Sequence, residues 1–236
     1  LNRLLEKQIN NIFFDLIIIS TPSTKRFEIF KKIVKRIKFR HMLIEKFLFN
    51  EKKNYDDCLK LIKNINSKIF VHCPRTEWKY FKDLKKFIKG KNKIEYTGSN
   101  WRIASNSIHF LDLFSFLINS EEIRLKKIKV DDKIQSKRNN YMEFYGKLNF
   151  VSSNNSSLTI DDNKKYKSSC MKIKFANFID EIKINMGQMN LIRYKDKRKI
   201  LEKNYKIPLT SKLTGKIIKN IFENRKVNLT ELKKSV

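Results

Sequence analysis

Apolar and polar positions in the N-terminal third of the chain change period several times. Residues 13–20 (FFDLIIIS) form a nearly continuous apolar run, which is typical of a strand covered on both faces in a parallel sheet. After a turn at 21–24, apolar residues recur at helical spacing through Ile37, with Lys and Arg between them. The remaining elements expected here are a helix over 1–8, a strand over 41–46, a helix over 55–65 and a strand over 68–73. This strand–helix order predicts a parallel α/β unit.

The pattern changes after residue 73. Helices are expected over 74–90, 106–118 and 213–226, with a strand-like segment at 93–99. Alternating apolar and polar positions separated by polar turns predict strands over 123–130, 142–152, 157–162, 170–177, 180–186 and 190–196. The predicted fold class is therefore α/β. A partial Rossmann-type parallel sheet (1–73) is followed by an α+β domain with an open, mainly antiparallel sheet (74–236).

Composition changes this picture little. The chain is 41% hydrophobic and carries a formal net charge of +29, which alone would suit a nucleic-acid-binding protein. Its lysines, however, alternate with apolar residues at helical spacing and form the solvent face of ordinary helices. A nucleic-acid reader needs a clustered basic stripe with aromatic or Arg readout residues. Nucleic-acid binding therefore stays an unfavoured alternative, and no apolar run approaches the roughly 20 residues of a membrane helix.

The cysteines and histidines predict neither a disulfide framework nor a metal site. Cys58, Cys73 and Cys170 are odd in number and widely spaced, and they form no zinc-binding pattern with the three histidines. Reduced cysteines of this kind favour a cytoplasmic protein. Trp78 and Trp101 are interpreted as core residues or as the wall of a substrate cleft.

Four ordered segments carry a family resemblance: FDLIIISTPSTKR, LIEKFLF, VHCPRTEWKYFKDLKKFI and GSNWRIASNSIHFLDLFSFL. In this order and spacing they resemble the Gfo/Idh/MocA oxidoreductases, especially members from sugar and polysaccharide biosynthesis clusters. The resemblance implies an N-terminal domain that binds NAD or NADP and a C-terminal open sheet that supplies the substrate side and the contact of a homo-oligomer. The expected activity is oxidation of a hydroxyl on a sugar or nucleotide sugar.

The same resemblance implies two sets of site residues. The catalytic set is Lys46, His109 and Asp112. The cofactor-binding set is Thr21, Pro22, Glu45 and Arg75. A His can take the hydroxyl proton near pH 7, and a Lys held close to another positive charge, here the nicotinamide ring, can have its pKa tuned or can stabilise the alkoxide. The competing interpretations are a solvated Lys46, a core His109, an Asp112 that orients His109 or caps structure, and an Arg75 held in a salt bridge.

Three departures from the family pattern bear on this hypothesis. Phe47 follows Lys46 where the family has a proline that aims the lysine, and Ser105 stands where many relatives have an Asp. No G-x-G-x-x-G is present, and all five glycines lie at Gly90 or later. We therefore expect the sequence to be a fragment of a longer reading frame. The alternative is a non-catalytic remnant that acts as a dimerisation or interaction module.

Overall fold

A computed structural model of the chain describes residues 12–136, 141–185 and 187–235. The helix expected over 1–8 lies outside these residues. The chain forms two compact units, and the first is discontinuous. Unit 1 comprises Leu1–Pro74 and Thr214–Val236, and unit 2 comprises Arg75–Leu213.

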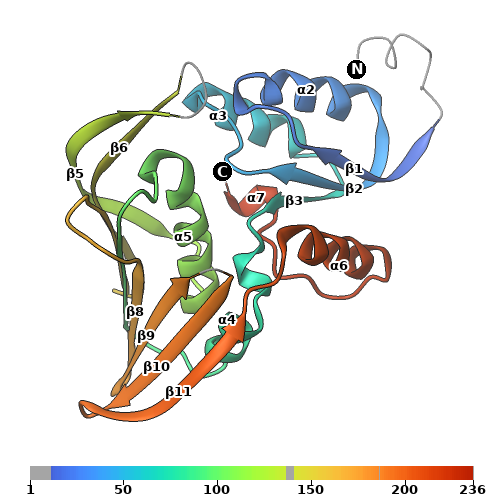
Figure 1. Cartoon of the computed structure of the whole chain (residues 1–236). Helices are drawn as coiled ribbons and strands as arrows, with labels where there is room; N and C mark the ends of the chain where they lie inside the picture. Colours follow the sequence, from blue (N-terminus) through green and yellow to red (C-terminus); the bar gives the residue numbers. More distant parts are fainter. Residues whose placement is uncertain (1–11, 137–140, 186, 236) are drawn as a thin grey trace. The chain divides into compact units, whose positions relative to one another are not determined.

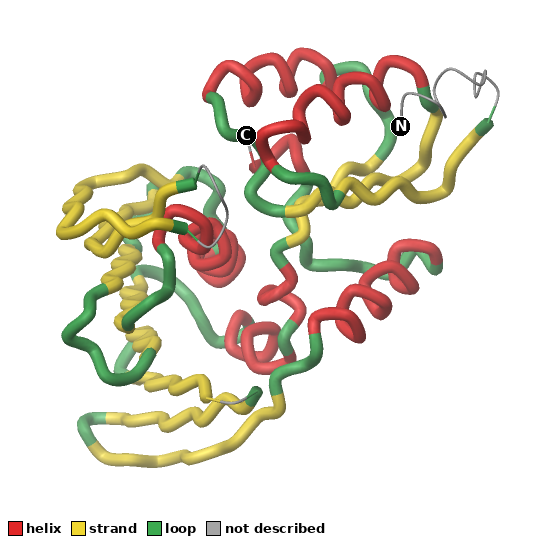
Figure 2. The backbone as a smooth tube through the Cα atoms, turned by 45° about the horizontal axis from the view of Figure 1, so that its top comes forward, coloured by secondary structure: helices red, strands yellow, loops and turns green. Residues whose placement is uncertain are grey.

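Unit 1 is built on a three-stranded parallel sheet. Its strands, in spatial order, are β1 (Phe13–Ile19), β2 (Lys38–Glu45) and β3 (Lys68–His72). Helices α2 (Ser23–Arg36) and α3 (Lys52–Ile62) lie on one face of this sheet (Figure 1). Figure 2 shows the same helices as red coils beside the three yellow strands. The parallel α/β order predicted from the apolar pattern is therefore confirmed.

The apolar stripe of α2 explains its place against the sheet. Phe27, Phe30 and Ile33 are at most 5% exposed, whereas the cationic residues of the last turn, Lys35 and Arg36, face solvent. Spacings of three residues place these apolar side chains on one helix face. The basic last turn also suits the negative end of the helix dipole.

The C-terminal segment returns to unit 1. Helix α6 (Thr210–Phe222) is followed by the short helix α7 (Leu232–Ser235). The backbone N–H of Val71 in β3 donates to the carbonyl of Thr230 at 2.9 Å, and Phe70 forms an antiparallel bridge with Glu231. The sequence-based division placed residues 214–236 with the second domain. Their contacts with β3 group them with the first unit instead.

Unit 2 is built on an eight-stranded mixed sheet in the order β11-β10-β9-β8-β4-β7-β6-β5. The strands are β4 (Asn92–Gly98), β5 (Ile123–Gln135), β6 (Met142–Ser152), β7 (Ser157–Asp162), β8 (Cys170–Phe175), β9 (Phe178–Asn185), β10 (Gln188–Lys195) and β11 (Arg198–Lys206). Within this sheet the β4–β7 pairing is parallel, and the other pairings between its described strands are antiparallel. Helices α4 (Lys79–Lys85) and α5 (Ile103–Ile118) join residues of β4, β7, β8 and β9 in one apolar core.

The expected fold class, a partial Rossmann-type sheet followed by a mainly antiparallel open sheet, is confirmed. Three elements differ from the sequence-based expectation, one of them the short helix α7, which was not expected. Strand β11 was not expected, and the helix over 74–90 is replaced by a 3₁₀ turn (Pro74–Glu77) and the shorter α4. The break falls at Trp78, whose backbone is extended at φ −67° and ψ 134°. No helix within the described part of the chain is long and apolar enough to cross a membrane.

Candidate active site

In unit 1 the predicted site residues gather at the carboxyl edge of the parallel sheet. Thr21 and Pro22 follow the end of β1, Glu45 ends β2, and Lys46 comes directly after it. Glu45 is aligned with His72, the last residue of β3. Open α/β sheets bind their ligands outside the carboxyl ends of the strands. The structure therefore brings four of the predicted residues to the edge where such folds bind ligands.

A hydrogen-bonded chain connects Glu45 to the returning C-terminal segment. The Nδ1 atom of His72 lies 2.8 Å from Glu45 Oε1, and its Nε2 atom lies 3.0 Å from Thr214 Oγ1. Burial acts to raise the pKa of Glu45, but the hydrogen bond and charge of His72, with the charges of Arg26 and Lys46, lower the pKa on balance. Glu45 is thus held as a carboxylate, with one oxygen committed to His72. Its predicted contact with a cofactor stays a prediction.

The surroundings of Thr21 show whether this edge of the sheet fits part of a bound dinucleotide. Its hydroxyl oxygen is buried and has no hydrogen-bond partner among the described residues. The adjoining N-terminus of α2 has no side-chain cap and no acidic residue in its first turn. A helix start of this kind favours a polar or anionic group. Thr21, Pro22 and the first turn of α2 therefore fit part of a bound NAD or NADP, although the glycine-rich pyrophosphate turn is not in the sequence.

In unit 2 the predicted residues divide between a helix and a pocket wall. His109 and Asp112 lie one turn apart on α5; the His109 side chain is half-buried and Asp112 is 8% exposed. Residues three apart on a helix are neighbours, so Asp112 can orient His109. Arg75 lines the pocket described next, and its guanidinium lies 4.6 Å above the ring of Phe110.

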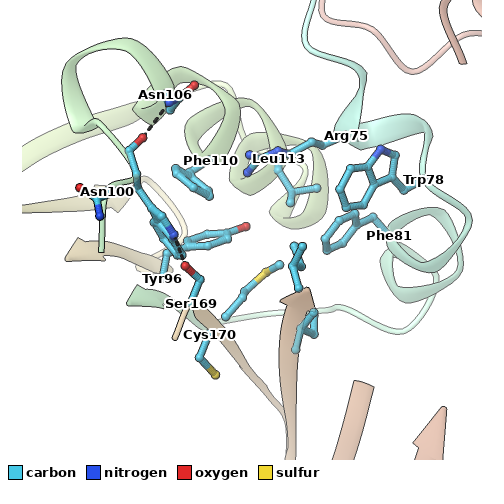
Figure 3. Close-up of a pocket in the computed structure, with 14 residues that line it drawn as sticks. Arg75, Trp78, Phe81, Tyr96, Asn100, Asn106, Phe110, Leu113, Ser169 and Cys170 are labelled. Carbon is cyan, nitrogen blue, oxygen red and sulfur yellow. Dashed lines mark hydrogen bonds between the residues drawn. The ribbon is translucent and has the colours of Figure 1, made fainter. Parts of the chain in front are cut away.

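The pocket lies within unit 2, between the helices and the sheet, and has a volume of about 320 Å³ (Figure 3). Its lining is partly aromatic, from Trp78, Phe81, Tyr96, Trp101 and Phe110. Polar lining groups come from Arg75, Asn100, Asn106, Ser169 and Cys170. Aromatic walls with a few polar groups are typical of small-molecule sites of this size. Both tryptophans of the chain belong to this lining and also pack against the apolar core of unit 2, so each of the two interpretations, core residue and cleft wall, stays a prediction.

Tyr96 is the one lining residue whose polar end is conspicuously unsatisfied. Its side chain is 1% exposed, and its hydroxyl has no hydrogen-bond partner among the described residues. In Figure 3 this hydroxyl points into the middle of the lining residues. Burial raises the pKa of Tyr96 strongly, and the charge of Arg75 offsets only part of that rise. A buried hydroxyl without a partner costs free energy that a ligand with a matching polar group would recover.

The loop before α5 forms a second wall of the pocket and is held in a strained shape. Asn100 and Arg102 both have positive φ angles, of 63° and 57°. Tyr145 donates a 2.6 Å hydrogen bond to the Asn100 side chain, and the Arg102 backbone N–H donates to Asp162 at 2.8 Å. The indole N–H of Trp101 donates to the Ser169 hydroxyl (Figure 3). Strain that is supported by so many contacts is frequent at ligand sites.

Sequence comparison and structure comparison give different results. No protein-family model and no curated protein matches the sequence. By structure, the chain is similar to UDP-N-acetylglucosamine 3-dehydrogenase GnnA from Acidithiobacillus ferrooxidans, at a TM-score of 0.66 and 11% identity over 99% of this chain and 76% of that one. It is also similar to the dehydrogenase MviM from Clostridium difficile, at a TM-score of 0.63 and 14% identity over 89% and 72% of the two chains.

A third similar structure carries a different kind of name. It is a super-repressor mutant of Gal80p from Saccharomyces cerevisiae, at a TM-score of 0.67 and 12% identity over 90% of this chain and 68% of that one. All three similarities span most of this chain. The chain therefore has the fold of the Gfo/Idh/MocA-type oxidoreductases, as its four motifs predicted.

Proposed function

We propose that this protein is an NAD(P)-dependent oxidoreductase that acts on a hydroxyl of a sugar or nucleotide sugar. The observation that carries the proposal is the position of Lys46, directly after a parallel strand at the ligand-binding edge of a sheet with this fold. The half-buried His109 on α5 supplies a second group suited to proton transfer. The names of GnnA and MviM support a dehydrogenase, and that of GnnA supports a nucleotide sugar.

Each residue has a distinct task in this proposal. Thr21, Pro22 and the first turn of α2 would hold part of NAD or NADP, which would supply the acceptor for a hydride from the carbon that carries the hydroxyl. His109 takes the hydroxyl proton at an imidazole nitrogen, and the Lys46 ammonium stabilises the negative charge that develops on the oxygen. Asp112 orients His109 from the next turn of α5. The aromatic pocket holds the apolar face of the sugar ring, while Arg75 and Tyr96 contact its polar substituents.

The test is oxidation of UDP-N-acetylglucosamine and related sugars by the full-length protein. The rate is measured as the formation of NADH or NADPH. Lys46→Ala and His109→Ala should each lower turnover about 10²–10⁴-fold, the range of positioned acid–base groups, with little change in cofactor affinity. Lys52→Ala is the matched control, because Lys52 is an exposed lysine in the first turn of α3. Wild-type turnover in both site variants would refute the assignment.

A second candidate is a non-catalytic interaction module. The sequence lacks the glycine-rich turn, and a repressor protein shares this fold. A fluorescence titration with NADH and NADPH separates the two functions. Binding of either nucleotide by the full-length protein supports the oxidoreductase. Absence of binding, together with absence of turnover, supports the module.

A further inference from the structure

Arg26 is a buried cation in the first turns of α2. Its side chain is 4% exposed and lies on the same helix face as Phe30 and Ile33, four and seven residues further along. Arginine is almost never buried unless its guanidinium is hydrogen-bonded, because desolvation of the charge is costly. The position of its partners therefore shows what this side chain holds in place.

The partners are backbone carbonyls from two separate strand ends. The Nε atom donates to the carbonyl of Thr21 at 3.0 Å, and Nη2 donates to the same oxygen. The Nη1 atom donates to the carbonyls of Glu45 at 2.7 Å, of Phe47, and of Leu48 at 3.4 Å. One guanidinium thus connects the turn after β1 with the segment after β2, and both belong to unit 1.

Lys46 lies between the carbonyls that Arg26 binds. The residue before it, Glu45, and the residue after it, Phe47, both accept from Nη1. Hydrogen bonds from a charged donor are stronger than those between neutral groups, and the planar guanidinium fixes their directions. The backbone at Lys46 is therefore held on both sides, although Phe47 lacks the fixed φ angle of a proline.

We propose that Arg26 is a positioning residue that aims Lys46 by clamping the carbonyls on either side of it and tying them to the Thr21 turn. In this chain the clamp does the work that a proline after the lysine would do through its restricted backbone. The inference rests on the proposed function for the purpose of Lys46, but the clamp itself can be measured without turnover. A competing role for Arg26 is general stabilisation of unit 1.

The activity-independent test compares Arg26→Ala, Arg26→Lys and the control Arg36→Ala in the full chain. Arg36 is an exposed arginine at the end of the same helix. Both Arg26 variants should raise two rates by about tenfold or more: hydrogen exchange of the backbone amides of residues 46–49, and chemical acylation of the Lys46 amine. Local opening of this segment is easier in the variants, because the hydrogen bonds from the guanidinium to the backbone carbonyls are already missing. Lysine has a single compact ammonium, so it does not replace the planar fork. Added guanidinium ion should slow both rates again in Arg26→Ala.

The activity test is a double-mutant cycle in the full-length protein. If Arg26 acts through Lys46, Arg26→Ala should lower turnover about 10²-fold in the wild-type background and hardly at all in Lys46→Ala. Equal losses in both backgrounds would assign Arg26 to general stabilisation and overturn the proposal. Wild-type rates of amide exchange and of Lys46 acylation in Arg26→Lys would also overturn the proposal. If Arg26→Ala does not fold, Arg26→Lys takes its place in both tests. Faster exchange without any turnover in wild type would support the clamp and refute the proposed enzyme.

Discussion

Removing the hydroxyl of Tyr96 should make the protein more stable and its pocket a poorer binding site. The Tyr96 hydroxyl is buried without a hydrogen-bond partner among the described residues. Tyr80 offers a matched substitution in the same unit, since it is 3% exposed and donates a 2.6 Å hydrogen bond to the buried carboxylate of Asp180. Tyr→Phe removes the same atom at both positions, so only the surroundings of that atom differ.

The two substitutions should change stability in opposite directions. Relief of an unsatisfied buried hydroxyl at Tyr96 is worth about 1–3 kcal/mol in favour of the folded state. Loss of a hydrogen bond to a charged group at Tyr80 costs about 1.5–3 kcal/mol. For a chain of this length each 1 kcal/mol moves the Tm by about 2–4 °C. Tyr96→Phe should therefore raise the Tm by several degrees, and Tyr80→Phe should lower it by a similar amount.

The free energy of unfolding and the Tm are measured by urea and thermal unfolding, with tryptophan fluorescence as the signal. Trp78 and Trp101 are the only tryptophans in the sequence and both line the pocket, so the signal reports on unit 2. A sugar that stabilises wild type should stabilise Tyr96→Phe less, because the ligand loses one hydrogen bond. Destabilisation by Tyr96→Phe would refute the reasoning, since it would show that the hydroxyl already has a partner.

Two further predictions concern unit 1 and the pocket loop. The pKa of Glu45 is lowered on folding, so its contribution to stability is present above the unfolded pKa and is lost as the pH falls through the lowered value. Glu45→Gln should flatten the fall of the urea midpoint between about pH 5 and pH 3, and an unchanged slope would contradict this. A Cβ at Gly98 would lie 2.6 Å from both Ser169 Oγ and the Trp101 indole nitrogen, whereas one at Gly215 meets nothing within 4 Å. In the same unfolding assay, Gly98→Ala should lower the free energy of unfolding by about 1–3 kcal/mol, and Gly215→Ala should raise it by about 0.5–1 kcal/mol. Equal effects of the two substitutions would contradict the difference in packing.

The elements with a strong apolar signal could be predicted from the sequence. The run FFDLIIIS and the stripe of Phe27, Phe30 and Ile33 mark a parallel strand and its covering helix. The helix stripe is buried as expected, but β1 is not covered on both faces, since Phe13 is 55% and Ile18 51% exposed among the described residues. Strand β11, by contrast, is almost entirely exposed and carries four lysines or arginines, so it has no apolar face to detect. Its strand state depends on pairing with β10, which is a tertiary contact.

The candidate site shows the same division. Lys46 and His109 were predicted from motifs. Tyr96, by contrast, looks like an ordinary apolar position of a strand in the sequence, and only the structure shows its buried hydroxyl without a partner among the described residues. Arg26 could have been noticed, because it shares a helix face with Phe30 and Ile33, where a solvated cation is out of place. The high lysine and arginine content of the chain conceals that signal. Its carbonyl partners come from two strand ends, which local sequence does not bring together.

The return of residues 214–236 to unit 1 affects the order in which the protein can fold. All of Arg75–Leu213 is synthesised before the C-terminal segment that pairs with β3. Unit 2 is a single stretch of the sequence, so it can begin to fold during synthesis. The edge of β3 stays unpaired until Thr230 and Glu231 have been synthesised. An unpaired strand edge is a template for wrong pairing. Until residues 230–231 have been synthesised, nascent unit 1 therefore exposes an edge of β3 that is open to pairing with other strands.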